Sequence, residues 1–239
     1  MTHNLTFHEK LLPTTSSNSE FFDGEPGDLL GALYDTITTA SGISSPSVEL
    51  QLELSERHTI EEMASNPVSL RFLQLLIAMV GARRVLEIGA FIGLSTIYMA
   101  KALPSGGEVV SIEKFDEFAA ICRKNFALNG VDNRIRLIVG DAFDILPSLP
   151  RQSSFDLIFI DGNKERYRDY FLAVEPLLAP GGMIVVDDVF FHGDAMNAAP
   201  RTTKGAGVKA FLEAAAGATG YRRLLLPIGN GMMLMLKPR

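Results

Sequence analysis

Carboxylates follow two apolar segments of this chain, at positions where they can act together. Asp161 comes directly after residues 155–160, and Asp187 and Asp188 come directly after residues 183–186. If both segments are neighbouring parallel strands, their carboxyl ends meet at one edge of a sheet. Three carboxylates gathered there repel one another unless a hard cation neutralises them, and oxygen ligands suit Mg²⁺, Mn²⁺ or Ca²⁺. The alternative is that Asp161 and Asp187 only cap the helices that follow.

A ligand-binding turn is indicated by residues 85–95, VLEIGAFIGLS, where an apolar strand ends and a helix opens. Gly89 and Gly93 let the backbone approach a ligand, and the helix start offers free N–H groups. The spacing lacks the G-x-G-x-x-G of dinucleotide binders. Glu87 would repel a pyrophosphate but can accept hydrogen bonds from an ammonium group. The turn therefore favours a cofactor without phosphates, with an ordinary strand-to-helix turn as the alternative.

Glu113 is a further acidic residue at a strand end. It follows the apolar residues 108–112 and lies 26 residues after Glu87, which leaves room for a crossover helix and a second strand. Both glutamates then stand at the same sheet edge, where an acid can hold ribose hydroxyls. The alternative is a solvated helix cap.

The elements that must position these residues alternate along the chain. We expect one helix that begins at Asn66 and Pro67 and ends before Gly81, and another over residues 116–129. Strands buried on both faces are expected at residues 84–88, 108–112, 135–139, 155–160 and 183–186. This alternation predicts an α/β fold with a doubly wound parallel sheet. An antiparallel hairpin is expected at its end, from residues 222–226 and 232–236.

With these motifs in this order, the chain resembles the class I S-adenosylmethionine-dependent methyltransferases. The resemblance is to the cation-dependent O-methyltransferases, which include the catechol and caffeoyl-CoA enzymes, and it covers residues 60–239. It rests on segments at residues 63–65, 85–95, 111–113, 140–142, 155–164, 180–188 and 226–231. The resemblance implies a Rossmann-like, mostly parallel seven-stranded sheet with an antiparallel C-terminal hairpin and helices on both faces.

The resemblance also implies two sets of binding residues. S-adenosylmethionine would be held by Ser65, Glu87, Gly89, Ser95, Glu113, Asp141, Ala142 and Asp161. Ser95 and Asp141 are equally open to a role as helix caps. The divalent cation, with Mg²⁺ as the first candidate, would be held by Asp161, Asp187 and Asp188. Related enzymes often have an asparagine in place of Asp188, so this site carries an extra negative charge.

Lys164 stands three residues after Asp161, and the two are the implied catalytic residues. The resemblance makes Lys164 the general base for the acceptor hydroxyl. A neighbouring divalent cation disfavours the ammonium form and can leave a neutral amine able to take a proton. The alternative is a solvated lysine on a helix surface.

The predicted reaction is in-line transfer of the sulfonium methyl to one hydroxyl of a metal-chelated vicinal dihydroxy, catechol-like aromatic molecule. Phe190 and Phe191 are candidates for an aromatic wall of the acceptor pocket, or for the core. Three alternatives stay open: a metal-independent small-molecule methyltransferase, a non-catalytic S-adenosylmethionine-binding protein, and a nicotinamide-dependent oxidoreductase. The last is disfavoured by the missing third glycine and by Glu87.

Composition bounds the remaining questions. The 239 residues carry a net charge of −6, which argues against a nucleic-acid partner, and the lone Cys122 excludes an intrachain disulfide. No apolar segment is as long as a membrane helix requires, so we expect a cytoplasmic protein without a membrane partner. Residues 1–60 are expected to form an N-terminal helical extension, with a helix at residues 28–39. Residues 61–239 would form the methyltransferase domain. The resemblance implies a homodimer, and the extension is the candidate contact.

Overall fold

The computed structural model describes residues 29–43, 50, 65–149 and 154–239. The chain divides into two compact units, residues 1–46 and residues 47–239. In the first unit the structure describes helix α3 (Leu29–Ala40), one residue later at each end than the sequence predicts. The domain boundary expected after residue 60 lies outside the described residues. None of the described helices has both the length and the apolar character needed to cross a membrane.

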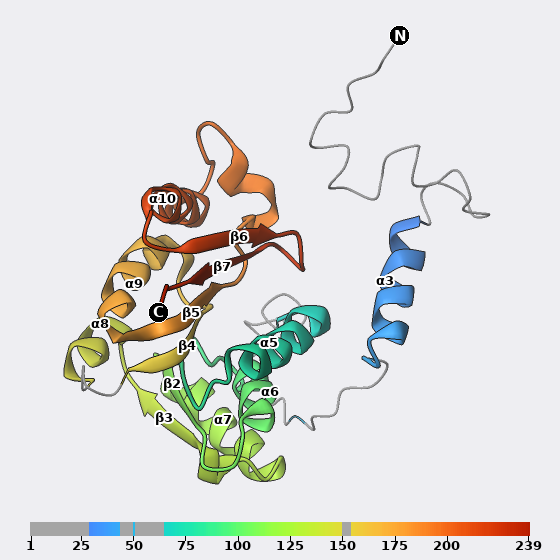
Figure 1. Ribbon diagram of the computed structural model, residues 1–239, viewed down its shortest axis with the longest axis vertical. Coiled ribbons are helices and arrows are strands. Elements are labelled where there is room, and N and C mark those ends of the chain that lie inside the picture. The colour runs from blue at the N-terminus through green and yellow to red at the C-terminus, as the bar shows by residue number, and fades with distance from the viewer. Residues whose placement is uncertain (1–28, 44–49, 51–64, 150–153) are drawn as a thin grey trace. The chain divides into compact units, whose positions relative to one another are not determined.

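The second unit is built on a seven-stranded sheet with the order β3-β2-β1-β4-β5-β7-β6 (Figure 1). Its strands are β1 (Arg84–Ile88), β2 (Glu108–Glu113), β3 (Ile135–Val139), β4 (Phe155–Ile160), β5 (Leu178–Val186), β6 (Arg222–Leu226) and β7 (Met232–Leu236). Strands β1 to β5 pair in parallel, and β7 lies antiparallel between β5 and β6. The predicted doubly wound sheet with a C-terminal hairpin is therefore confirmed.

Helices cover both faces of this sheet (Figure 1). Helices α5 (Pro67–Val80), α6 (Leu94–Ala102) and α7 (Asp116–Leu128) pack on one face, and α8 (Ala142–Ile145), α9 (Tyr167–Val174) and α10 (Thr203–Gly217) on the other. Short 3-10 turns join them: η2 (Asp132–Arg134), η3 (Leu146–Ser148), η4 (Lys164–Arg166), η5 (Glu175–Leu177) and η6 (Phe191–Met196).

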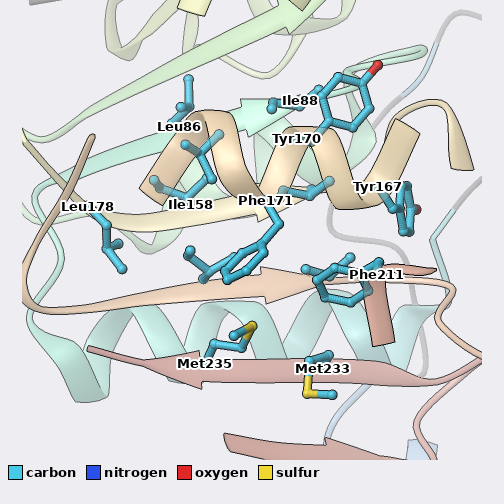
Figure 2. Packing of buried hydrophobic residues seen from close by; sticks show 14 of the residues in the cluster. Leu86, Ile88, Ile158, Tyr167, Tyr170, Phe171, Leu178, Phe211, Met233 and Met235 are labelled. Carbon is cyan, nitrogen blue, oxygen red and sulfur yellow. The ribbon is translucent and has the colours of Figure 1, made fainter. Parts of the chain in front are cut away.

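Two apolar cores follow from the two-residue period of the strands. Val85 of β1 packs among side chains of α5, α6 and α7, whereas its neighbour Leu86 packs on the opposite face. On that second face Phe211 of α10 meets the rings of Tyr167 and Phe171 edge to face, at centroid distances of 6.2 and 6.0 Å (Figure 2). Aromatic pairs with this geometry stabilise packing beyond the area they bury. The cores therefore fix both helix layers against the sheet.

Local sequence explains where α5 begins and ends. The Asn66 side chain accepts a hydrogen bond from the Val68 N–H at 2.8 Å, and Pro67 occupies the first helical position. Gly81 ends the helix with a φ of 68°, a left-handed conformation that glycine adopts without steric cost. Both predicted boundaries are confirmed.

Strand β5 is longer than predicted, because it begins at Leu178 rather than Met183. Pro180, Gly181 and Gly182 look like a turn in the sequence. In the structure the register with β4 shifts at this point, and the C-terminal segment bonds to both glycines: Gly181 N–H donates to Pro238 O and Lys237 N–H to Gly182 O. Tertiary pairing thus holds an irregular segment in the sheet.

Candidate active site

The turn after β1 is in backbone contact with the end of β4. Gly89 has a φ of 97°, and a Cβ added there would lie 2.3 Å from the carbonyl oxygen of Asp161. Gly93 is the N-cap residue before α6, with a φ of 86°, and its added Cβ would lie 2.5 Å from the Phe126 ring. Only glycine fits either position without moving the backbone or a core side chain. The glycines therefore allow a tight strand-to-helix turn beside Asp161.

Glu87 points into the core rather than into the turn. Its side chain is fully buried and accepts hydrogen bonds from the hydroxyls of Ser95 and Thr96 on α6 and Ser111 on β2, with Ser95 and Ser111 each at 2.5 Å. Burial raises the pKa of Glu87 to about 7, and the three hydroxyls partly oppose that rise. Ser95 therefore binds Glu87 and does not cap its helix. Their cofactor roles stay predictions.

Glu113 holds the glycine turn against the end of β2. Its two carboxylate oxygens accept hydrogen bonds from the Phe91 N–H at 2.8 Å and the Phe115 N–H at 2.9 Å. Burial raises the pKa of Glu113, and these backbone donors lower it in part. Phe91 has a φ of 52°, which a non-glycine residue adopts at a cost. The structure thus places Glu113 beside the turn, as the sequence predicts.

Asp141 and Ala142 lie at the end of β3. Asp141 caps α8 by accepting from the Phe143 N–H at 3.0 Å, and it pairs with Lys114 at 3.0 Å. These contacts lower the pKa of Asp141. Ala142 is buried. The capping alternative is confirmed for Asp141, and its position at the sheet edge leaves the cofactor role open.

Lys164 lies between two carboxylates that come from different strands. Its ammonium is 2.9 Å from Asp161 Oδ1, after β4, and 3.0 Å from Asp188 Oδ2, after β5. Only 17% of its side chain is exposed, so it is not a solvated surface lysine. Burial lowers the pKa of Lys164, but interactions with Asp161, Tyr167 and Asp188 raise it by more than burial lowers it. The net shift of the pKa is upward. The predicted neighbours at the two strand ends are thus in contact.

Asp161 has two further neighbours. The Tyr167 hydroxyl donates to its Oδ1 at 3.4 Å, and the Ser65 hydroxyl to its Oδ2 at 3.5 Å. Burial raises the pKa of Asp161, Lys164 opposes the rise, and Asp188 adds to it. The helix cap at this junction is Asn163, not Asp161, and the Asn163 side chain accepts from the Glu165 N–H at 3.2 Å. The Asp161 carboxylate therefore does not cap the helix that follows it.

Asp187 is the most buried carboxylate at the end of β5. It is 6% exposed, and its Oδ1 accepts the Asp188 N–H at 2.9 Å. Burial raises its pKa to about 8, and the charge of Asp161 adds to that rise. Asp188, Phe191 and His192 all have positive φ angles, of 63°, 42° and 51°. Such strained backbone concentrates at functional sites.

A family comparison identifies the class of protein to which this fold and site belong. Residues 39–238 match the family described as O-methyltransferase. The chain belongs to the O-methyltransferase family. A nicotinamide-dependent oxidoreductase is not supported by this match. The fold and the order of the motifs agree with the family expected from the sequence.

Individual relatives of this O-methyltransferase family member agree. A catechol O-methyltransferase of Niastella koreensis is 39% identical over 129 residues, which are 53% of this chain and 58% of the relative. A catechol O-methyltransferase of Mycobacterium tuberculosis is 37% identical over 148 residues, 62% of this chain and 67% of the relative. A solved structure, the O-methyltransferase TomG of Streptomyces achromogenes in complex with SAM, is 28% identical, with a TM-score of 0.70 over 98% of this chain and 100% of that one.

Several residues of this O-methyltransferase site were not found by sequence reasoning. Thr96 and Ser111 bind Glu87, and Tyr167 donates to Asp161. A hydroxyl inside an otherwise apolar helix or strand is an indication of a buried partner, and both Thr96 and Ser111 are fully buried. That indication names no partner, because the partner lies on another element.

Proposed function

We propose that this chain transfers a methyl group from S-adenosylmethionine to a hydroxyl of an aromatic small molecule with two adjacent hydroxyls. The observation that carries the proposal is the position of Lys164, held between Asp161 and Asp188 beside the glycine turn of β1. Membership of the O-methyltransferase family supports the reaction. The names of the two bacterial catechol O-methyltransferases support the acceptor class.

The turn and the strand ends around it suit S-adenosylmethionine. Gly89 lets the turn after β1 approach the backbone of Asp161, and Glu113 stands at the next strand end, where ribose hydroxyls can be bound. The SAM complex of TomG supports this cofactor. Ser65 would meet the methionine end, and Asp141 and Ala142 the adenine. Glu87, because it is enclosed, would act by holding Ser95 and α6 in place.

The acidic cluster fits a divalent cation by charge and donor type. Asp161, Asp187 and Asp188 supply carboxylate oxygens, and the Lys164 ammonium pairs with Asp161 and Asp188. Burial raises the pKa of Asp187, and the negative charge of Asp161 adds to that rise. Among the described residues, no group of three His, Cys, Asp or Glu side chains is gathered in the geometry of a metal site. These three aspartates would hold the ion, with Mg²⁺ as the first candidate.

The residues of the chain then divide the chemistry between them. The acceptor oxygen attacks the methyl carbon, the C–S bond breaks as the C–O bond forms, and the electron pair of that bond stays on sulfur. Lys164, oriented by Asp161, takes the hydroxyl proton as its neutral amine, a form that the carboxylates of Asp161 and Asp188 by themselves disfavour. A bound divalent cation would supply positive charge that lowers the pKa of both the phenol and the lysine. Holding the acceptor oxygen and the methyl carbon in line can lower the activation barrier by roughly several kcal/mol.

Mass spectrometry tests this proposal. Purified protein is incubated with S-adenosylmethionine and a panel of vicinal dihydroxy aromatics, with Mg²⁺ and again with excess EDTA. We expect a product one methyl heavier that disappears with EDTA and returns with added metal. The described residues show no formed metal site, so a metal-independent methyltransferase is the second candidate. Product formation that continues in EDTA would favour the metal-independent methyltransferase. Absence of S-adenosylmethionine binding would contradict both candidate functions.

Asp188→Asn tests the ligand set separately from turnover. Loss of one negative charge from the three aspartates should weaken Mg²⁺ binding, measured by isothermal titration calorimetry. Asp116→Asn, an exposed substitution at the start of α7, is the control. Unchanged Mg²⁺ affinity in Asp188→Asn would count against this residue as a ligand.

The proposal includes the assembly and location expected from the resemblance, a cytoplasmic homodimer. Sedimentation equilibrium tests the first part, since a monomer at micromolar concentration would contradict it. Fractionation of cells tests the second.

A further inference from the structure

The 3-10 turn η4, which carries Lys164, is short. It spans three residues, and its backbone is held locally by the Asn163 side chain, by the Arg166 N–H to Asn163 O bond of 2.9 Å and by the Tyr167 N–H, which donates to Lys164 O. If the lysine amine is to stay within hydrogen-bond distance of two carboxylates, the backbone that carries it must be held in a single conformation. The structure must therefore provide contacts from outside η4.

Helix α10 supplies such contacts through its first two turns. A Cβ added at Gly207 would lie 2.5 Å from both Lys164 O and Glu165 Cα. Those are backbone atoms, so no side-chain rotation can make room. The Thr203 hydroxyl also hydrogen-bonds to Glu165 Oε1. Helix α10 therefore touches the backbone of Lys164 directly and holds the residue that follows it.

Glycine in this position has a cost that packing must offset. Glycine inside a helix is less favourable than alanine by roughly 0.5–1 kcal/mol. Gly217, at the other end of the same helix, has no atom within 4 Å of an added Cβ. Gly207 differs because its missing side chain is what lets α10 reach η4. The close approach, rather than helix formation, accounts for this glycine.

The same end of α10 is also tied to the loop after β5. Gly205 lies so close to Asp194 of η6 that an added Cβ would be 2.1 Å from Asp194 Oδ2. Asp194 accepts from the N–H groups of Arg201 and Thr202 and from the Thr202 hydroxyl, which hold its pKa at about 2. Helix α10 thus contacts the loops that follow β4 and β5, the two strands whose aspartates bind Lys164.

We propose that Gly207 and Thr203 are positioning residues that set where Lys164 stands between Asp161 and Asp188. The inference rests on the proposed function, in which Lys164 is the base. Neither residue touches the turn after β1 where the cofactor is expected. Gly207→Ala should therefore displace Lys164 while leaving S-adenosylmethionine binding intact. A displacement of about 1 Å at a reacting group can reduce a rate about 100-fold.

Gly207→Ala and Gly217→Ala form the matched pair that tests this. We expect Gly207→Ala to lower kcat about 10-fold or more, with the Kd for S-adenosylmethionine unchanged by calorimetry, whereas Gly217→Ala keeps the wild-type kcat. A crystal structure of Gly207→Ala should show longer distances from Lys164 Nζ to Asp161 and Asp188. That readout needs no turnover, so it judges the inference even if the proposed reaction fails. Equal kcat values, or unchanged Lys164 distances, would overturn it.

Thr203 variants cover the case in which Gly207→Ala does not fold. Thr203→Val removes the hydroxyl that binds Glu165 and adds no bulk to the contact. Thr203→Ser keeps the hydroxyl. We expect Thr203→Val to lower kcat several-fold without changing the Kd for S-adenosylmethionine, and Thr203→Ser to restore it. A kcat that is the same in both variants would contradict a positioning role for this hydroxyl.

Discussion

The environment of Lys164 predicts the effect of removing its amine. Asp161 and Asp188 each lie within 3.0 Å of the ammonium, so the side chain is fixed between the two strand ends where we propose that it acts as the base. General-base catalysis contributes typically about 100-fold to 10,000-fold. We expect Lys164→Met to lower kcat by about 100-fold or more in the mass-spectrometric assay. Lys101→Met, on the exposed end of α6, is the control. Full turnover of Lys164→Met at neutral pH would end the base assignment.

Glu87 makes stability depend on pH. Its pKa is about 7 in the folded protein against 4.5 in the unfolded chain, so between these values the folded state binds more protons. The free energy of unfolding therefore falls as pH rises through this window, by about 3 kcal/mol in total. Glu87→Gln lacks that loss, because glutamine stays neutral. We expect its stability relative to wild type to rise from pH 5 to pH 8 in urea unfolding.

Glu117→Gln is the control for that experiment, since Glu117 is exposed on α7. Its stability relative to wild type should change little over the same range. A Glu87→Gln difference that is equally flat with pH would show that this carboxyl does not titrate in the window.

At the scale of single residues, the sequence located the acidic groups but not all their partners. Residues at strand ends are predictable because parallel strands end at one edge, and this placed Asp161, Asp187 and Asp188 together. The inward direction of Glu87 was not predictable from its place two residues before Gly89. Its direction depends on hydroxyls that come from α6 and β2. Hydrogen-bond partners on other elements appear only once those elements have packed.

The turn between β1 and α6 depends on glycine at two positions, Gly89 and Gly93. Gly89→Ala would force a Cβ against the Asp161 carbonyl and would also strain a φ of 97°. We expect it to lower stability by more than the roughly 1–2 kcal/mol that a left-handed conformation costs a non-glycine residue, and to weaken S-adenosylmethionine binding. Unfolding in urea and calorimetry measure the two effects.

Gly81→Ala separates strain from collision. Gly81 has a φ of 68°, but nothing lies within 4 Å of an added Cβ. It should therefore show the cost of the conformation alone, with cofactor binding unchanged. If both variants lose the same stability, the close approach to Asp161 contributes nothing.

Among the elements, strand positions were predictable, but β2 ends one residue later than expected and β5 begins five residues earlier. Continuous apolar runs mark strands, so β1, β3 and β4 begin and end where the sequence predicts. The expected burial on both faces is confirmed for β1 and β4. It is wrong for β3, an edge strand whose Arg136 is exposed and whose other residues are half-buried. The first half of β5 contains proline and two glycines, which indicate a turn. Its pairing with the C-terminal segment overrides that local preference. Local patterns cannot report a partner that lies about 60 residues further along the chain.

For the whole domain, the two cores on opposite sides of the sheet should respond independently to small cavities. Ile97 lies fully buried in one core and Ile184 in the other. Ile97→Val and Ile184→Val should each cost about 1 kcal/mol in urea unfolding. The double variant should lose the sum, because distant sites without shared partners are additive within about 0.5 kcal/mol. A larger departure would mean that the sheet transmits packing strain between its faces.

The position of β7 also sets an order of events during synthesis. This strand is made after every other strand of the domain, yet it lies between β5 and β6. The loop after β5 depends on the segment just before it, because Val189 and Phe190 donate backbone hydrogen bonds to Gly231 and Asn230. Until residues 230–236 have left the ribosome, β5 is an open edge and β6 has no place in the sheet. A nascent chain that already contains Asp161, Lys164 and Asp188 therefore still lacks the backbone hydrogen bonds that hold the loop directly after Asp188.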